Sequence, residues 1–128
     1  MTQRVTVRAK GEDARAGGYL RTLKNRFPKA KLRGVAVTES YTIDSKLSPR
    51  ELMRAAESLA NPIIEEYSTG AVLAPKTFSV AIEIGFLPGV TDNVGHTVRE
   101  MIEDATGRYF KEGEAVYTSR FLFLSGDI

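Results

Sequence analysis

Hydrophobic and polar residues follow two different periods in the first part of the chain. Residues 5–9 alternate at every second position, which predicts a strand with one buried face. Over residues 14–27 the apolar positions recur at intervals of three and four, which predicts a helix that ends before Pro28. Its expected buried face comprises Tyr19, Leu20, Leu23 and Phe27. A β-rich run over 32–43 follows, with Val35, Val37, Tyr41 and Ile43 on one face and Ala36, Thr38 and Thr42 on the other.

A helix start is the clearest local signal in the sequence. Ser48 and Glu51 have the spacing of a capping box, and Pro49 suits the first helical position. The helix is expected to run to about Ala60, burying Leu52, Ala55, Ala56 and Leu59. Asn61-Pro62 ends it, residues 63–67 read as a short strand, and 68–75 read as a connector.

A second series of elements begins at Phe78. Phe78, Val80, Ile82 and Ile84 are expected on one side of a strand. After a loop over 85–90, Thr91, Asp92 or Asn93 can cap a helix that Gly107 ends. The apolar positions of that helix are Val94, Val98, Met101, Ile102 and Ala105. Residues 115–124 predict a last strand, with Val116, Phe121 and Phe123 as its buried residues.

The two series form an internal duplication, in which the second copy lacks its last helix and strand. Val37-Thr38 before Tyr41 matches Tyr117-Thr118 before Phe121 at an offset of 80 residues. We therefore expect residues 1–70 as a first unit, 71–77 as a connector and 78–128 as a second, truncated unit. The fold class predicted is an α+β two-layer sandwich of tandem βαββαβ-type units, packed as one compact pseudo-dimeric domain. Its helices should lie on one face of a largely antiparallel sheet.

Composition limits the possible chemistry. The chain has 128 residues, one His and no Cys or Trp, so cysteine nucleophiles, disulfides and His/Cys zinc clusters are excluded. No apolar run is long enough to span a bilayer, and the first ten residues lack the apolar core of a secretory signal. We therefore expect a cytoplasmic protein with no membrane partner.

Charge is distributed unevenly. Residues 1–33 hold ten basic and two acidic side chains, a net charge of +8, whereas the remaining 95 residues have a net charge of −6. Such an asymmetry is typical of solvated helix and strand faces, and less often of a surface for a protein or nucleic acid. We rank a protein partner above nucleic acid.

Candidate catalytic groups are few. Gly85, Gly89, Gly95 and Gly107 match neither the Walker pattern nor GxGxxG and are assigned to loop geometry, with Gly89 in a turn that needs positive φ. An anion could sit at the helix start near Asp92 in the Gly89–Gly95 loop, although Asp92 itself would oppose it. His96 is assigned to an exposed helix position, because no partner for a general base is visible. Two carboxylate pairs, Glu65-Glu66 and Glu103-Asp104, are assigned to the solvated surface. We therefore assign no catalytic, cofactor-binding or metal-binding residue.

Three stretches resemble a known family. Leu59-Ala60-Asn61-Pro62-Ile63-Ile64-Glu65-Glu66-Tyr67 resembles the helix-to-strand junction of the PurS subunit of phosphoribosylformylglycinamidine synthase. Two further stretches resemble the tandem PurS-like N-terminal region of fused PurS–PurL chains: Leu87-Pro88-Gly89-Val90-Thr91-Asp92-Asn93-Val94-Gly95 and Glu114-Ala115-Val116-Tyr117-Thr118-Ser119-Arg120. The first copy departs from this pattern, because residues 11–17 replace the corresponding loop.

The resemblance implies a non-catalytic structural component of that enzyme in purine (IMP) biosynthesis. The whole enzyme is an ATP- and glutamine-dependent ligase, and its ATP, Mg and glutamine would be used by partner domains rather than by this chain. The implied partners are a PurL-type synthetase, in the same longer chain or as a separate subunit, and a PurQ-type glutaminase. The component would bridge the two and support ammonia transfer between them.

Other readings of the sequence lead to further expectations. A partial repeat leaves a sheet edge unpaired, so we expect the isolated chain to self-associate and the residues after Phe121 to be the weak end of the fold. The alternative function is a small RNA- or ligand-binding module that uses the basic N-terminal third. That alternative needs Tyr19 or Phe27 to be exposed for stacking, whereas their helical spacing predicts burial.

Overall fold

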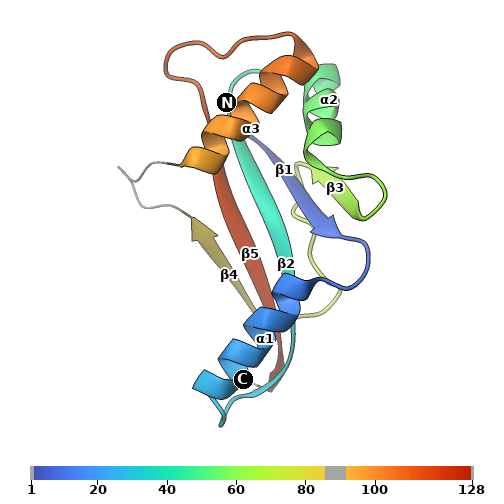
Figure 1. The fold of residues 1–128 in the computed structure, drawn as a ribbon, viewed down its shortest axis with the longest axis vertical. Coiled ribbons are helices and arrows are strands. Elements are labelled where there is room, and N and C mark those ends of the chain that lie inside the picture. Colours follow the sequence, from blue (N-terminus) through green and yellow to red (C-terminus); the bar gives the residue numbers. More distant parts are fainter. Residues whose placement is uncertain (1, 86–91, 128) are drawn as a thin grey trace.

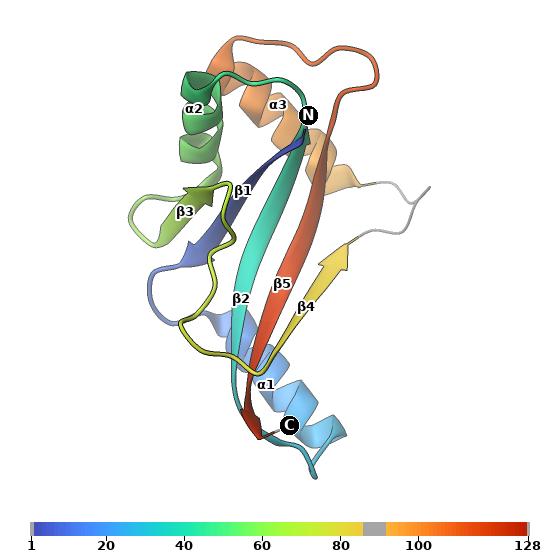
Figure 2. The same cartoon turned by 180° about the vertical axis from the view of Figure 1, so that it is seen from behind.

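Three helices cover one face of a single sheet. The structure, a computed structural model, describes residues 2–85 and 92–127. Its elements run in the order β1 (Thr2–Ala9), α1 (Ala14–Arg26), β2 (Lys31–Asp44), α2 (Pro49–Leu59), β3 (Glu65–Thr69), β4 (Val80–Gly85), α3 (Asn93–Thr106) and β5 (Ala115–Asp127). All three helices lie in front of the sheet in Figure 1 and behind it in Figure 2. The described residues therefore form the predicted two-layer α+β fold.

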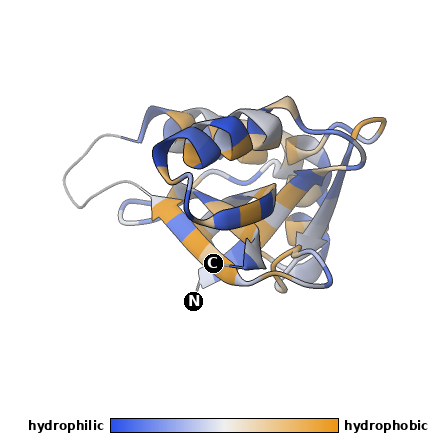
Figure 3. Ribbon diagram, turned by 90° about the horizontal axis from the view of Figure 1, so that it is seen from below, coloured by the Kyte–Doolittle hydropathy of each residue, from blue (hydrophilic) through white to orange (hydrophobic). Residues whose placement is uncertain are grey.

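The sheet is antiparallel throughout, with the strand order β3-β1-β2-β5-β4. The two long strands β2 and β5 form its centre and pair from Lys31 opposite Asp127 to Asp44 opposite Ala115. Alternating side chains point to opposite faces of each strand, and this alternation appears as bands of two colours along the strands in Figure 3. Because partners in register share a face, Ile43 and Val116 lie together on the helix side.

The core lies between α2, α3 and the adjoining half of the sheet. Ala55 and Ala56 of α2 and Val98 and Ile102 of α3 are buried there, as the sequence predicted. The remaining members of the core are Val5, Val7, Ile43, Leu47, Ala60, Phe110 and Val116, with Tyr41, Leu52, Leu59 and Tyr67 packed against them. The small alanines let α2 approach closely, which explains why a helix with only two fully buried residues can close this end of the fold.

The other face of the sheet is partly covered by the segment between β3 and β4. Figure 2 shows this segment passing across β1 and β2. It is held by two buried threonines: the Thr38 hydroxyl donates to the carbonyl oxygen of Leu73 at 2.7 Å, and the Leu73 N–H donates to the Thr6 hydroxyl at 3.1 Å. The polar side of β2 is therefore buried at Thr38, because this segment supplies hydrogen-bond partners there.

The predicted helix ends are confirmed. Ser48 accepts a hydrogen bond from the Glu51 N–H at 3.1 Å, and the Glu51 carboxylate accepts one from the Ser48 N–H at 2.9 Å, which completes the capping box. Asp92 is the residue that caps α3. Gly107 ends α3 with φ of 71°, a left-handed conformation that glycine adopts without a steric penalty.

The burial predicted for α1 is wrong at Phe27. The helix contains no fully buried residue, and the Phe27 side chain is 57% exposed. Phe27 is the C-cap and has φ of −127° and ψ of 68°, so the backbone has already left the helix. Its side chain therefore no longer continues the apolar stripe formed by the preceding turns.

The apolar positions predicted for α3 are only partly buried. Val98 and Ile102 are buried together with Gly95, whereas Val94 is 54% and Met101 40% exposed. The buried residues are spaced by three and four positions, which defines a narrow contact stripe towards α2 and β5. Val94 and Met101 lie beside that stripe.

Two strand predictions also need correction. β3 begins at Glu65 rather than at residue 63, because the carbonyl oxygen of Asn61 accepts hydrogen bonds from the N–H groups of Ile64 and Glu65 in a turn. β4 begins at Val80, so Phe78 does not share its alternation. The Phe78 ring instead packs 5.0 Å, centroid to centroid, from that of Phe123.

The sequence predicts that the residues after Phe121 form the weak end of the fold, beside an unpaired sheet edge, but the structure places them inside the sheet. β5 lies between β2 and β4, and Leu122 and Phe123 are buried within it. Phe121 is half-buried, with its ring stacked on that of Phe123. The residues after Phe121 therefore belong to a central strand, and the free edge of this half of the sheet is β4.

Candidate functional site

Two of the stretches that carry the family resemblance meet at Asp92. One carboxylate oxygen of Asp92 accepts from the Gly95 N–H at 2.7 Å, which caps α3. The other accepts from the Thr118 N–H at 2.8 Å, and the Thr118 hydroxyl donates to the carboxylate at 3.0 Å. Asp92 therefore joins the start of α3 to β5. We call Asp92, Gly95 and Thr118 the α3 latch.

Gly95 is required by close packing rather than by loop geometry. It lies inside α3, and a Cβ atom there would sit 2.5 Å from the carbonyl oxygen of Val116 and 2.9 Å from Cγ of Asp92. Real Cβ atoms do not approach other atoms so closely, so any other residue would push α3 away from β5. The assignment of Gly95 to a loop is therefore wrong. Gly89 and its turn lie outside the described residues.

The α3 latch lies where the sequence analysis considered an anion, at the N-terminus of α3. The Asp92 carboxylate occupies the N–H of Gly95, which an anion would otherwise use. The described part of this loop, Asp92 to Gly95, therefore carries its own negative charge at the helix N-terminus.

A charged cluster ties α1 to the centre of the sheet. Glu39 of β2 accepts a hydrogen bond from Nε of Arg120 of β5 at 2.7 Å and also pairs with Arg15 of α1. Arg120 donates a second bond, of 2.9 Å, to the Tyr19 hydroxyl of α1. Arg15 further pairs with Asp13, the N-cap of α1, at 3.3 Å. We call Arg15, Tyr19, Glu39 and Arg120 the Glu39 cluster.

The electrostatics of the Glu39 cluster keep both guanidinium groups charged. Burial alone would lower the pKa of Arg120, but Tyr19 and Glu39 outweigh it and raise that pKa. The pKa of Arg15 is raised in the same way, since Asp13 and Glu39 outweigh the effect of burial. Burial, followed by the negative charges of Glu39 and Glu65, raises the pKa of the neighbouring Tyr41 hydroxyl. At neutral pH the Tyr41 hydroxyl therefore keeps its proton.

The Glu39 cluster and the α3 latch border one open cavity of about 520 Å³ between α1 and α3. Its lining consists of Arg15, Tyr19, Glu39, Tyr41, Glu65, Ile84, Gly85, Val94, Thr118, Ser119 and Arg120. The polar groups of the cluster bond to one another, so they leave few free donors or acceptors for a reacting substrate. This arrangement holds α1 in place and presents a mixed polar and apolar surface.

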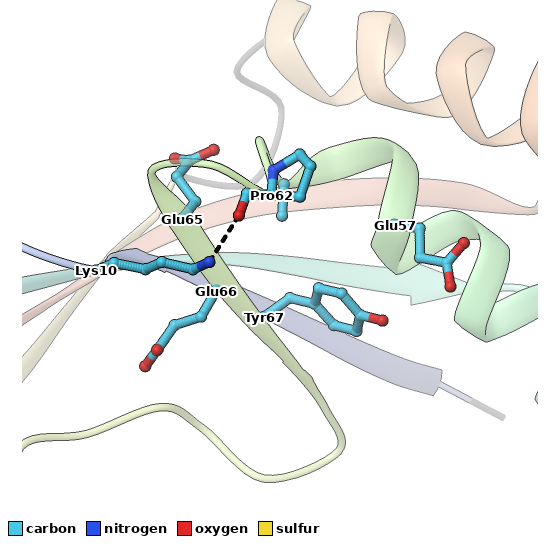
Figure 4. A pocket seen from close by; sticks show the side chains of 7 residues that line it. Lys10, Glu57, Pro62, Glu65, Glu66 and Tyr67 are labelled. Carbon is cyan, nitrogen blue, oxygen red and sulfur yellow. Dashed lines mark hydrogen bonds between the residues drawn. The ribbon is translucent and has the colours of Figure 1, made fainter.

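A second cavity, of about 580 Å³, lies at the β3 edge of the sheet. Figure 4 shows Lys10 reaching across it, where Nζ donates to the carbonyl oxygen of Pro62 at 2.6 Å. Tyr67 also lines this cavity, and its hydroxyl donates to Sδ of Met53 at 3.2 Å. Ile63, next to Pro62, is 83% exposed, and Ile64 is 60% exposed. This edge therefore presents apolar side chains beside a charged cavity.

The carboxylate pairs singled out in the sequence do not converge. Glu65 accepts from the Asn61 N–H at 2.8 Å, whereas Glu66 pairs with Nε of Arg8 at 2.6 Å, as expected for neighbours on opposite faces of a strand. Glu103 is not simply solvated, because it accepts from the Phe110 N–H at 2.8 Å and its side chain is only 11% exposed. Asp104 is exposed.

The remaining candidate groups form no reactive set among residues 2–85 and 92–127. His96 is exposed on the first turn of α3, and no hydrogen bond of its imidazole is found in this part of the chain. Nor do the described residues contain a group of three or more His, Cys, Asp or Glu side chains placed to hold a metal ion.

The Glu39 cluster was missed by sequence reasoning, although one signal pointed to it. Glu39 is the one charged residue among the alternate positions Val35, Val37, Tyr41 and Ile43, which face the helices. A carboxylate on such a face needs a partner. Its partners, Arg15 and Arg120, are distant in the sequence and come together only through strand pairing.

Comparisons with protein-family models, with curated proteins and with solved structures found no match to this chain. No helix in the described part of the chain is long and apolar enough to cross a membrane.

Proposed function

We propose that this chain is a non-catalytic assembly component of phosphoribosylformylglycinamidine synthase, bridging synthetase and glutaminase parts and supporting ammonia transfer. The α3 latch carries the proposal. Two stretches that resemble tandem PurS-like chains, about 20 residues apart in the sequence, meet there through Asp92, Gly95 and Thr118. These residues contact one another, as expected if the resemblance reflects a shared fold.

The pairing of the long strands supports the tandem arrangement. At the offset of 80 residues found in the sequence, Glu39 corresponds to Ser119 and Ser40 to Arg120. Glu39 pairs with Arg120, and Ser40 pairs with Ser119. A two-fold rotation that exchanges β2 with β5 would therefore exchange these two residue pairs. Such a rotation would relate β1-α1-β2 to β4-α3-β5, as in a pseudo-dimer.

The β3 edge offers a surface for the partner subunits. Ile63 and Ile64 belong to the third stretch that carries the resemblance, and both are largely exposed. Adjacent exposed isoleucines beside a cavity are typical of an interaction site. We assign this edge to contact with the PurL-type synthetase or the PurQ-type glutaminase.

Reconstitution tests the proposal. The chain is mixed with a PurL-type synthetase and a PurQ-type glutaminase from the same genome, and amidine formation is measured with glutamine and, separately, with free ammonia. We expect the chain to co-elute with both partners and to increase the glutamine-dependent rate, while free ammonia bypasses this requirement.

The matched variants are Ile63→Asp, at the β3 edge, and Tyr109→Ala, at a site 79% exposed and outside this edge. Ile63→Asp should weaken co-elution and Tyr109→Ala should not. If the chain neither co-elutes nor changes the glutamine-dependent rate, the proposal is wrong.

A second candidate function is supported by the exposure of Phe27. Around it, Arg21, Lys24, Arg26, Lys29, Lys31 and Arg33 are all exposed. No ion pair of these six residues is found within the part of the chain that the structure describes, whereas Arg4, Arg8, Arg15, Arg99, Arg108 and Arg120 are all paired. An exposed aromatic ring among free cations is the arrangement used to bind single-stranded RNA.

Binding of a fluorescent oligouridine distinguishes this candidate. If it is correct, affinity falls steeply with salt, and Phe27→Ala weakens binding while Tyr109→Ala does not. Equal, weak binding by all three proteins would leave the basic residues with a solubilising role.

A further inference from the structure

The edge strand β4 carries an exposed apolar row on its helix-side face. Val80, Ile82 and Ile84 are 39%, 41% and 49% exposed, and they lie opposite Leu124, Leu122 and Arg120 of β5. Within the described residues no strand pairs with this edge, and Figure 1 shows β4 as the outermost strand. Val94 of α3 joins Ile84 in lining the cavity between α1 and α3. The apolar row therefore continues from β4 onto α3.

The two edges of the sheet differ in their protection against further pairing. β3 contains Glu65 and Glu66 and is closely preceded by Pro62, features that discourage the addition of another strand. β4 has a single charged residue, Glu83, and its charge is already balanced within the chain. The Glu83 carboxylate lies 3.5 Å from the Arg4 guanidinium and accepts a hydrogen bond of 2.6 Å from the Ser119 hydroxyl.

We propose that two copies of this chain associate through their β4 strands, antiparallel and centred on Ile82. In this register Ile82 lies opposite Ile82 of the second copy, and Val80 lies opposite Ile84. On the other face Glu83 lies opposite Ala81, so no like charges meet. Centring the pair on Glu83 would instead place two carboxylates opposite each other, which is unfavourable.

A second copy fits this edge because the pattern of β4 is symmetric about Ile82. An isologous contact requires each residue to find its own counterpart across a two-fold axis, and the apolar row does so. The pair would extend the five-stranded sheet into a ten-stranded one across two chains. Because β4 has only six residues, the contact is small compared with the interface of a permanent dimer. We therefore expect a reversible dimer whose population rises with protein concentration.

Single-cysteine variants test the register, since the natural chain contains no cysteine. Ile82→Cys places two thiols opposite each other at the two-fold axis, within reach of a disulfide. At micromolar protein, the high effective concentration within the dimer should make this disulfide form on the order of 100-fold faster than for Ile63→Cys at the β3 edge. Because Ile63 is the more exposed residue, chance collision would favour the control variant.

Sedimentation equilibrium of the full chain provides the second test. We expect a monomer–dimer equilibrium for the wild type, loss of the dimer in Ile82→Lys, and no change in Ile64→Lys. Circular dichroism checks that both variants keep the native fold, which is expected because both sites are already exposed. A strictly monomeric wild type at high concentration, equal disulfide formation by the two cysteine variants, or an open-ended polymer would each overturn the proposal. The partner contacts proposed above are tested separately at Ile63.

Discussion

Gly95 offers the most direct test of the α3 latch, and Gly18 provides a matched control. Gly95→Ala adds a methyl group where the carbonyl oxygen of Val116 is 2.5 Å away and the Asp92 carboxyl carbon 2.9 Å away. Gly18→Ala adds the same methyl group inside α1, where no atom lies within 4 Å apart from the adjacent residues and the surrounding helix backbone. Both substitutions replace glycine by alanine within a helix, so a loss of stability at Gly95 alone reports the packing of α3 on β5.

The two substitutions are expected to change the free energy of unfolding in opposite directions. Overpacking typically costs about 1–3 kcal/mol. Displacing the Asp92 cap adds roughly 1 kcal/mol. Alanine in place of glycine recovers about 1 kcal/mol of helix propensity. The free energy of unfolding of Gly95→Ala should therefore fall by about 1–3 kcal/mol, whereas that of Gly18→Ala should rise by roughly 0.5–1 kcal/mol.

Urea unfolding followed by circular dichroism measures both changes, because the chain has no tryptophan to serve as a fluorescent probe. A double-mutant cycle with Asp92→Ala then tests whether part of the cost of Gly95→Ala arises through the cap. We expect the two substitutions to be less than additive, since both disturb the same carboxylate. If Gly95→Ala is as stable as the wild type, or shifts in the same direction as Gly18→Ala, the packing argument is wrong.

Three further predictions concern charged and titrating groups. Glu39→Gln removes the shared partner of Arg15 and Arg120, so we expect a loss of about 1 kcal/mol in urea unfolding that shrinks as salt is added. The backbone hydrogen bond from Ser48, aided by Arg108, lowers the pKa of Glu51. The stability that the Glu51 carboxylate contributes is therefore present above its pKa in the unfolded chain, and it is lost as pH falls through its pKa in the folded protein. Glu51→Gln should therefore flatten the acid side of the stability profile. Burial raises the pKa of Tyr41. The stability that the neutral Tyr41 hydroxyl contributes is therefore full below its pKa in the unfolded chain, near 10, and it is lost as pH rises through its pKa in the folded protein. Tyr41→Phe should therefore lose less stability at alkaline pH, and an unchanged profile would contradict this reasoning.

The candidate site shows where sequence reasoning reached its limit. The capping box at Ser48 and the C-cap at Gly107 were predictable because each is defined within a few residues of one helix. Asp92 was one of three candidate caps, and its second bond, to Thr118, was not predicted. That bond depends on how α3 lies on β5, which no local pattern specifies.

Exposure proved harder to predict than secondary structure. The helical period is correct up to Arg26, but the Phe27 side chain is exposed because the backbone leaves the helix at that residue. Thr38 lies on the opposite face of β2, as its parity predicted, and this polar position is buried by hydrogen bonding to the segment between β3 and β4. The deciding feature is local at Phe27, whereas at Thr38 it is a contact with a segment 35 residues away in the sequence.

The order and type of the elements, the caps at Ser48 and Gly107 and the shared face of Val35, Val37, Tyr41 and Ile43 can be read from the sequence alone. These features follow from periodicity and short-range hydrogen bonding, which involve residues a few positions apart. The pairing of β2 with β5, which brings Glu39 to Arg120, and the position of β4 at the edge of the sheet emerge from the folded structure. Strand partners are chosen by the packing of whole faces over long sequence separations, and that choice also locates the surface on which a second copy is proposed to bind.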